Sequence, residues 1–172
     1  VLQLATVVAA LQVFALVMPS PKPTGETLRL AIVQGGGPQG VLAINASARD
    51  AFDRHLKVTQ TLQSTDELDA VLWPENVIDV VDFELSKEFD EIVAEANRLN
   101  THFIVGITED AGPNRFTNAQ VVVKSTGEIT SRYDKVRRVP FGEFVPLRGL
   151  LETLGAPVDR IPRDALAGSD IA

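Results

Sequence analysis

Three charged residues of this sequence stand where they could carry acid–base or acyl-transfer chemistry: Glu75, Lys135 and Glu143. The lysine and the second glutamate lie within residues 133–146, a segment whose two prolines and one glycine are set among apolar side chains. Proline fixes φ, and glycine permits backbone conformations that other residues resist. The segment therefore predicts a rigid loop that directs Lys135 and Glu143 toward a common site.

Glu75 follows the apolar residues 70–72 and the pair Trp73–Pro74. Because proline cannot continue the pairing of a strand, Glu75 is expected just past a strand's carboxyl end, where ligand sites of α/β sheets lie. Taken alone, such a glutamate most often faces solvent, and Lys135 with Glu143 would form a structural ion pair. Together, the residues predict a site in which two carboxylates keep one lysine charged.

These two segments resemble the nitrilase superfamily, which uses a Glu-Lys-Cys triad, and more narrowly the apolipoprotein N-acyltransferases, bacterial membrane enzymes that add the third acyl chain to lipoproteins. In that family a Trp-Pro-Glu-Asn or Trp-Pro-Glu-Ser run carries the general base. A Tyr-x-Lys run followed by Val-Pro-Phe-Gly-Glu-Phe-Val-Pro carries the catalytic lysine and an accessory glutamate. Residues 73–76 and 133–146 match these runs at nearly every position.

The resemblance implies a role for each charged residue. Glu75 would be the general base, Lys135 would stabilise the oxyanion, and Glu143 would orient Lys135 or the incoming amine. The same resemblance implies three aromatic substrate contacts, at Trp73, Phe141 and Phe144.

The resemblance also implies the substrates. The acyl donor would be a membrane phospholipid, and the acceptor would be the α-amine of a diacylglyceryl-cysteine at the N-terminus of an apolipoprotein. The reaction would be ping-pong through a thioester, with no metal or organic cofactor. Arg137 and Arg138 are expected on the surface of the loop, where they could meet lipid phosphates. The apolar residues among 144–151 would suit a lipid entry or ordinary core packing equally well.

One departure from the family is large: the sequence contains no cysteine, so the nucleophile is absent. The chain also begins with Val1 rather than methionine. We therefore expect a fragment that ends before its nucleophile and is inactive by itself.

Two alternatives remain open at this point. The first is a nitrilase-type amidohydrolase with the same triad. The second is a non-catalytic, membrane-anchored relative that has lost its nucleophile. The apolar first 18 residues argue against a soluble amidase, whereas the missing cysteine keeps the non-catalytic relative in consideration.

The composition excludes several other classes. A net charge of −7 over 172 residues provides no basic surface for nucleic acid. Zero cysteines exclude a disulfide framework and a thiolate metal site, and two distant histidines predict no metal cluster.

The first 18 residues carry no charge and, as a helix, would extend about 27 Å, close to the thickness of a bilayer's hydrocarbon core. They predict the end of a transmembrane helix, with a signal peptide or a buried helix as alternatives. Residues 19–27 are rich in proline and predict a linker, and residues 28–172 predict an incomplete catalytic domain. The resemblance implies a bacterial cytoplasmic (inner) membrane location, with the catalytic domain on the periplasmic face.

Apolar periodicity along residues 28–172 predicts an alternation of strands and helices. Strands are expected at 28–33, 70–73, 101–108, 117–124 and 129–133, and helices at 43–62, 85–100 and 147–154. This order is typical of a layered α/β sheet. The nitrilase resemblance narrows the expected fold to part of an α-β-β-α sandwich.

Overall fold

The structure, a computed structural model, describes residues 2–18, 24–37 and 47–169. Its strands are β1 (Leu30–Ile32), β2 (Ala70–Leu72), β3 (Ile78–Val80), β4 (His102–Asp110), β5 (Arg115–Val123), β6 (Ile129–Asp134) and β7 (Asp164–Ala165). Its α-helices are α1 (Leu2–Val17), α2 (Ala48–Thr59), α3 (Lys87–Leu99) and α4 (Arg148–Thr153). Two short 3-10 helices lie at Ser64–Asp66 and Val158–Arg160.

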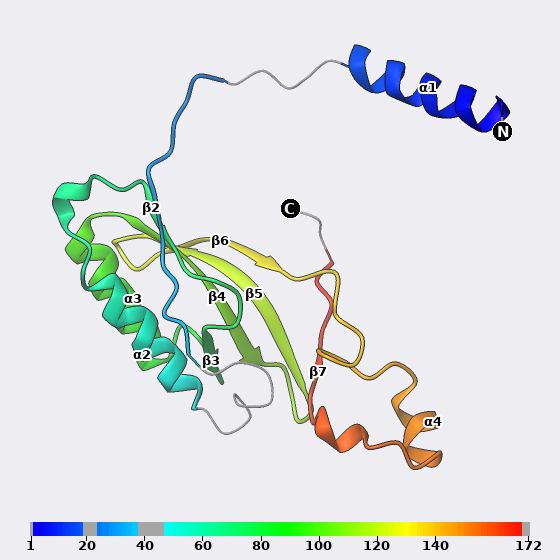
Figure 1. Ribbon diagram of the computed structural model, residues 1–172. Helices are drawn as coiled ribbons and strands as arrows, with labels where there is room; N and C mark the ends of the chain where they lie inside the picture. Colours follow the sequence, from blue (N-terminus) through cyan, green and yellow to red (C-terminus); the bar gives the residue numbers. More distant parts are fainter. Residues whose placement is uncertain (1, 19–23, 38–46, 170–172) are drawn as a thin grey trace.

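The described strands form one sheet in the order β1-β2-β4-β5-β6, with β3 beside β4 and β7 beside β5 (Figure 1). The strands β1, β2 and β4 are parallel because α2 and α3 provide the crossovers between them. Short turns join β4 to β5 and β5 to β6, and these pairs are antiparallel. The expected α/β order is therefore confirmed.

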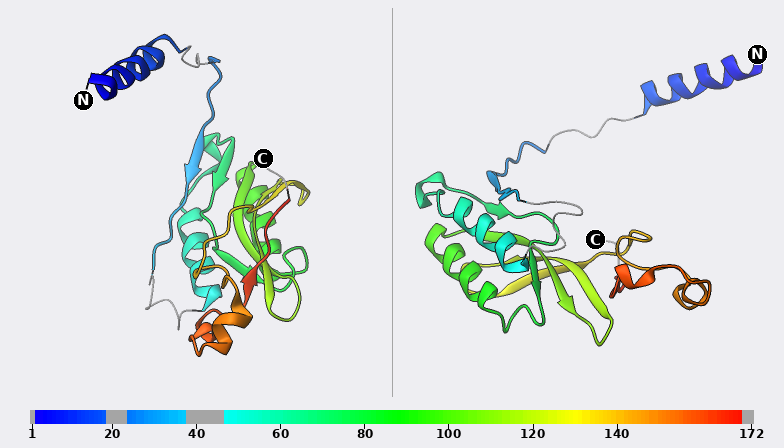
Figure 2. Two further views of the ribbon diagram at one scale, coloured as in Figure 1. Left: turned by 90° about the vertical axis from the view of Figure 1, so that its right-hand side faces the viewer. Right: turned by 60° about the horizontal axis from the view of Figure 1, so that its bottom comes forward.

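Helices α2 and α3 cover the same face of the sheet (Figures 1 and 2). Ser47 caps α2 through a capping box with Asp50, and the side chain of Ser86 accepts a hydrogen bond from Phe89 N to cap α3. Under the helices lies the hydrophobic core, which takes alternate residues of the central strands. Its fully buried side chains include Val71, Phe103, Val105, Ile107 and Val121.

The opposite face of the sheet carries a row of apolar residues that the strand register places side by side: Ile32, Leu72, Ile104 and Val122. Ile32 is 76% exposed, so this face is incompletely covered by the described residues. A sandwich of four layers needs a second sheet, whereas the described residues form one sheet with two helices on one side. The complete α-β-β-α arrangement therefore stays a prediction.

Two strands escaped the sequence analysis. β3 has three residues and β7 has two, so neither shows a measurable alternation of apolar and polar side chains. β2 and β3 both pair with β4, one after the other, and the chain leaves the sheet between them. This interruption includes Glu75.

Several helix boundaries also differ from those expected. The helix expected at 43–62 begins at Ala48 and ends at Thr59, and residues 43–46 lie outside the described part of the chain. Residues 19–23 of the expected linker also lie outside it. Helix α1 lies apart from the sheet (Figure 1). Among the described residues, no helix combines the length and the apolar character needed to cross a membrane, so the expected span at residues 1–18 is not confirmed.

Candidate active site

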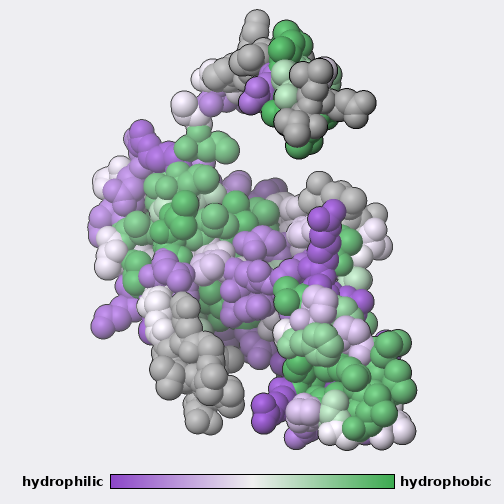
Figure 3. Space-filling model, turned by 45° about the vertical axis from the view of Figure 1, so that its right-hand side comes forward, coloured by the Kyte–Doolittle hydropathy of each residue, from purple (hydrophilic) through white to green (hydrophobic). Residues whose placement is uncertain are grey.

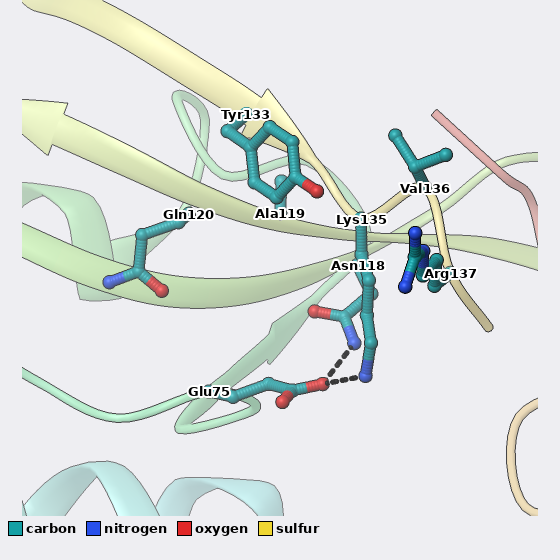
Figure 4. A pocket seen from close by; sticks show the side chains of 8 residues that line it. All are labelled: Glu75, Asn118, Ala119, Gln120, Tyr133, Lys135, Val136 and Arg137. Carbon is teal, nitrogen blue, oxygen red and sulfur yellow. Dashed lines mark hydrogen bonds and ion pairs between the residues drawn. The ribbon is translucent and has the colours of Figure 1, made fainter. Parts of the chain in front are cut away.

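Glu75, Lys135 and Glu143 lie together, although 68 positions separate the first from the last in the sequence. Lys135 Nζ donates to Glu75 Oε1 at 2.6 Å and to Glu143 Oε1 at 2.8 Å. Figure 4 shows the contact between Lys135 and Glu75 at the edge of a cavity. The three side chains therefore meet as expected, with one lysine held between two carboxylates, and their catalytic roles stay a prediction.

Lys135 follows β6 directly, and its backbone N–H donates to Asn118 O at 2.8 Å, which extends the pairing with β5. Strand side chains alternate between faces, and Lys135 shares the face of Tyr133, opposite the helices. Gly168 N donates to Lys135 O at 3.0 Å from the other side. Backbone contacts on both sides thus fix the lysine.

Glu75 reaches the same face because the chain leaves the sheet between β2 and β3. Trp73 N and Val77 N still donate to β4, at Ile104 O and Gly106 O, so residues 74–76 form the excursion. Gly106 leaves room for it on that face, since its missing Cβ would meet the Glu75 backbone. The Glu75 side chain is 50% exposed.

Glu143 belongs to a tight loop that closes on itself. Glu143 N donates to Val139 O at 2.8 Å, and Glu143 Oε2 accepts from Val139 N at 2.7 Å. Phe141 has a positive φ of 59°, and its N–H donates to Phe144 O at 2.8 Å. The Glu143 side chain is only 12% exposed, so the loop presents its carboxylate to Lys135 rather than to water.

Burial and hydrogen bonding act in opposite directions on these groups. Burial alone would lower the pKa of Lys135, but its hydrogen bonds to Glu143 and Glu75 outweigh burial and raise that pKa above its ordinary value. Burial would raise the pKa of Glu143, but the hydrogen bonds from Lys135 and Val139 N hold that pKa below its ordinary value. The ammonium and the carboxylate therefore keep each other ionised at neutral pH.

Asn118 is a further member of the site that the sequence analysis missed. Its Nδ2 donates to Glu75 Oε1 at 2.6 Å and to Glu143 Oε1 at 3.1 Å, and the residue is 4% exposed. Lys135 and Asn118 thus donate to the same two oxygens. The available signal was a polar residue inside a strand, which by itself indicates only a buried hydrogen bond.

A cavity of about 450 Å³ opens beside the lysine. It is lined by Glu75, Asn118, Ala119, Gln120, Tyr133, Lys135, Val136 and Arg137 (Figure 4). A second cavity of about 420 Å³ shares Glu75 and Gln120 with it and extends along Ile32 and Leu72. Within the described residues, no group of three or more His, Asp or Glu side chains is arranged to hold a metal ion.

The three aromatic residues expected to contact substrate do not line the cavity that contains Lys135. The Trp73 indole is fully buried, donates to Thr59 Oγ1 at 3.0 Å and packs edge-on against Phe52. That ring belongs to the core, whereas Trp73 also lines the second cavity, so its contact with substrate stays a prediction. Phe141 is 64% exposed and Phe144 packs against the Arg138 guanidinium, so their contact with substrate stays a prediction.

Residues 29–169 match the family model described as "Carbon-nitrogen hydrolase". Among curated proteins, the apolipoprotein N-acyltransferase of Mycolicibacterium smegmatis is 31% identical over 173 residues, covering 90% of this chain and 29% of that protein. The apolipoprotein N-acyltransferase of Vibrio cholerae serotype O1 is 29% identical over 150 residues, covering 84% of this chain and 29% of that protein. The chain thus spans about three tenths of the length of these relatives.

Solved structures show the same fold at low identity. The NitN amidase from Neterenkonia sp. AN1 superposes with a TM-score of 0.53 at 14% identity, covering 84% of this chain and 51% of that one. The family match covers most of the chain and includes Glu75, Lys135 and Glu143. The chain therefore belongs to the carbon-nitrogen hydrolase family, within the nitrilase superfamily.

Proposed function

We propose that this chain is the first part of the catalytic domain of an apolipoprotein N-acyltransferase. The observation that carries the proposal is Lys135 held between Glu75 and Glu143 beside an open cavity. Similarity to relatives that bear this name supports the choice of acyl transfer over other reactions of the superfamily. The acyl donor would be a membrane phospholipid and the acceptor an apolipoprotein.

The first half-reaction acylates a cysteine that this chain does not contain. Glu75 takes the thiol proton, the thiolate attacks the ester carbonyl, and the oxyanion that forms faces Lys135. The ester C–O bond then breaks, and the departing lysophospholipid alkoxide takes the proton from Glu75. Glu75 suits this role because both hydrogen bonds that its carboxylate accepts from the described residues go to Oε1, which leaves Oε2 for the proton.

The second half-reaction transfers the acyl group to the amine. The amine nitrogen attacks the thioester, and Lys135 again faces the oxyanion. The C–S bond breaks, an amide forms, and Glu75 passes the amine proton to the departing thiolate. Glu143 acts through Lys135, which it holds in place from the buried side.

Exposed apolar side chains support a location beside a bilayer. Hydrophobic surface gathers at the end of the molecule that carries α4 (Figure 3), where Leu147, Leu150 and Leu154 are 75%, 56% and 72% exposed. Val145 is buried, so some apolar residues of this region pack in the core while these three leucines remain exposed. We place the parent enzyme at the bacterial cytoplasmic membrane, with this domain on its outer face.

A chimera tests the function. Residues 28–169 replace the matching segment of the Mycolicibacterium smegmatis relative, whose remaining residues complete the catalytic domain. Transfer of an acyl group from phospholipid to a diacylglyceryl-cysteine lipopeptide is measured by mass spectrometry. We expect transfer, its loss in Glu75→Gln, and its retention in Glu67→Gln, which changes an 80% exposed carboxylate. A folded chimera that hydrolyses simple amides but transfers no acyl group would instead support the amidohydrolase.

A further inference from the structure

We propose that Arg137 binds the phosphate of the phospholipid donor at the cavity beside Lys135; this inference rests on the proposed acyl transfer. Arg137 lines the same cavity as Glu75 and Lys135 (Figure 4). Some charged side chains around this cavity are already paired with one another, whereas Arg137 is available to a ligand.

The charges of the catalytic group are paired with one another. Lys135 donates to both Glu75 and Glu143, and the three residues together carry one net negative charge. A phosphodiester, which is itself an anion, would be repelled by such a group. Arg137 adds a positive charge at the cavity, which brings the summed charge of the catalytic group and Arg137 to zero, so an anionic donor can approach the lysine.

Among the arginines near the site, Arg137 is also the one whose guanidinium is available to bind a ligand. Arg138 donates to Ala165 O at 2.9 Å and lies 4.3 Å over the Phe144 ring, and Arg132 pairs with Glu109 and Asp134. Within the described residues, the Arg137 side chain makes no hydrogen bond or ion pair. The sequence does not distinguish Arg137 from Arg138. In the structure, Arg138 contacts Ala165 and Phe144, whereas Arg137 lines the cavity and is available to a ligand.

The geometry of guanidinium suits phosphate in particular. Its planar fork can donate two parallel hydrogen bonds to two phosphate oxygens, which lysine cannot do. In a glycerophospholipid the phosphate lies only a few bonds from the ester carbonyl. Arg137 follows Lys135 by two positions and lines the same cavity. One bound phospholipid could therefore place its ester carbonyl at Lys135 and its phosphate at Arg137.

Tyr133 provides a direct probe of this cavity because it lines the wall and is the sole tyrosine of the chain. The 172-residue protein, labelled with ¹³C-tyrosine and held in a neutral detergent, is titrated with dihexanoyl-phosphatidylglycerol. Dihexanoylglycerol provides the arm without phosphate, and inorganic phosphate provides the arm without lipid. The measured quantity is the Kd from the shift of the Tyr133 ring signal.

We expect a saturable shift with the phospholipid and a much weaker one in both other arms. Arg137→Ala should weaken phospholipid binding about tenfold or more, as expected for losing hydrogen bonds to a charged group. Arg137→Lys should recover part of the affinity. Arg115→Ala, which removes an equal charge from an exposed position outside the cavity, should leave the Kd unchanged.

An Arg137→Ala protein that binds the phospholipid as tightly as the unaltered protein would overturn the inference. So would inorganic phosphate binding as tightly as the lipid, because the site would then recognise any phosphate. Fluorescence of the sole tryptophan, Trp73, verifies that each variant is folded. Phospholipid binding that depends on Arg137 in a chimera without acyl transfer would refute the proposed function and leave this inference standing. Acyl transfer in a chimera whose phospholipid binding does not depend on Arg137 would overturn this inference and leave the proposed function standing.

Discussion

Glu75 lies directly against Gly106. A Cβ built on Gly106 would be 2.6 Å from Glu75 Cα and 2.4 Å from Pro74 O, both of which are backbone atoms. The φ of Gly106 is not positive, so the position needs glycine for space and not for conformational freedom. This contact lets the chain between β2 and β3 lie on the sheet and brings the general-base candidate to Lys135.

Gly106→Ala should therefore destabilise the domain and displace Glu75. We expect a loss of about 1–3 kcal/mol in the free energy of unfolding, because backbone atoms must move to admit the methyl group. The measurement is urea unfolding followed by Trp73 fluorescence. Gly149→Ala is the matched control, since a Cβ there meets nothing within 4 Å, and its stability should be unchanged or slightly higher. Equal stability of the two variants would contradict the close contact.

Lys135→Met should abolish most acyl transfer in the chimera. The variant removes the charge that we propose faces the oxyanion and leaves two carboxylates close together, and we expect a fall of about 10²–10³-fold or more in kcat. Lys124→Met is the control, because Lys124 pairs with Glu128 in the turn between β5 and β6, away from the cavity. A Lys135→Met enzyme with nearly full kcat would rule out the assigned role.

Stability should depend on pH through the Glu143–Lys135 pair. The pKa of Glu143 is held below its ordinary value of 4.5, so its contribution is present above that pH and is lost as the pH falls through the lowered pKa. The pKa of Lys135 is raised above 10.5, so its contribution is present below that pH and is lost as the pH rises through the raised pKa. Both contributions are complete between these limits.

Urea unfolding at a series of pH values measures this dependence. Glu143→Gln should flatten the acid side of the profile relative to the unaltered protein, because the variant has no carboxyl group to protonate there. Glu128→Gln, which alters an exposed carboxylate, is the control and should retain the full acid slope. An acid slope that Glu143→Gln leaves intact would show that other carboxylates cause it.

Asn118→Asp should be more harmful than its small change in size suggests. Asn118 donates to both Glu75 and Glu143, so an aspartate there would replace two donated hydrogen bonds with a third negative charge. We expect a loss of about 1–3 kcal/mol in stability at neutral pH, with partial recovery in mild acid. Unfolding at two pH values measures it, with exposed Asn114→Asp as control. No difference between the variants would remove Asn118 from the site.

The 172-residue chain by itself should transfer no acyl group. It contains no cysteine, and neither Glu75 nor Lys135 can form the thioester. Incubation with labelled phospholipid, followed by mass spectrometry of the intact protein, should show no acyl adduct. An adduct that forms on the unaltered chain but not on Glu75→Gln would reveal a different nucleophile.

The sequence by itself determined the parts of this protein that depend on local chemistry. Apolar periodicity located the principal strands and helices, because side-chain burial repeats along each element. Proline and glycine marked the turns that carry Glu75 and Glu143, and the motif around Lys135 brought the three residues into one hypothesis.

Only the tertiary structure decided the features that depend on contacts between distant segments. It brought Asn118 to both carboxylates and buried Trp73 in the core. It also distinguished Arg138, which donates to Ala165 O, from Arg137, which lines the cavity. Short strands such as β3 also appeared only there, because pairing with β4, not a pattern of their own, defines them. Such partners are set by strand register and packing, which the order of residues within one segment does not encode.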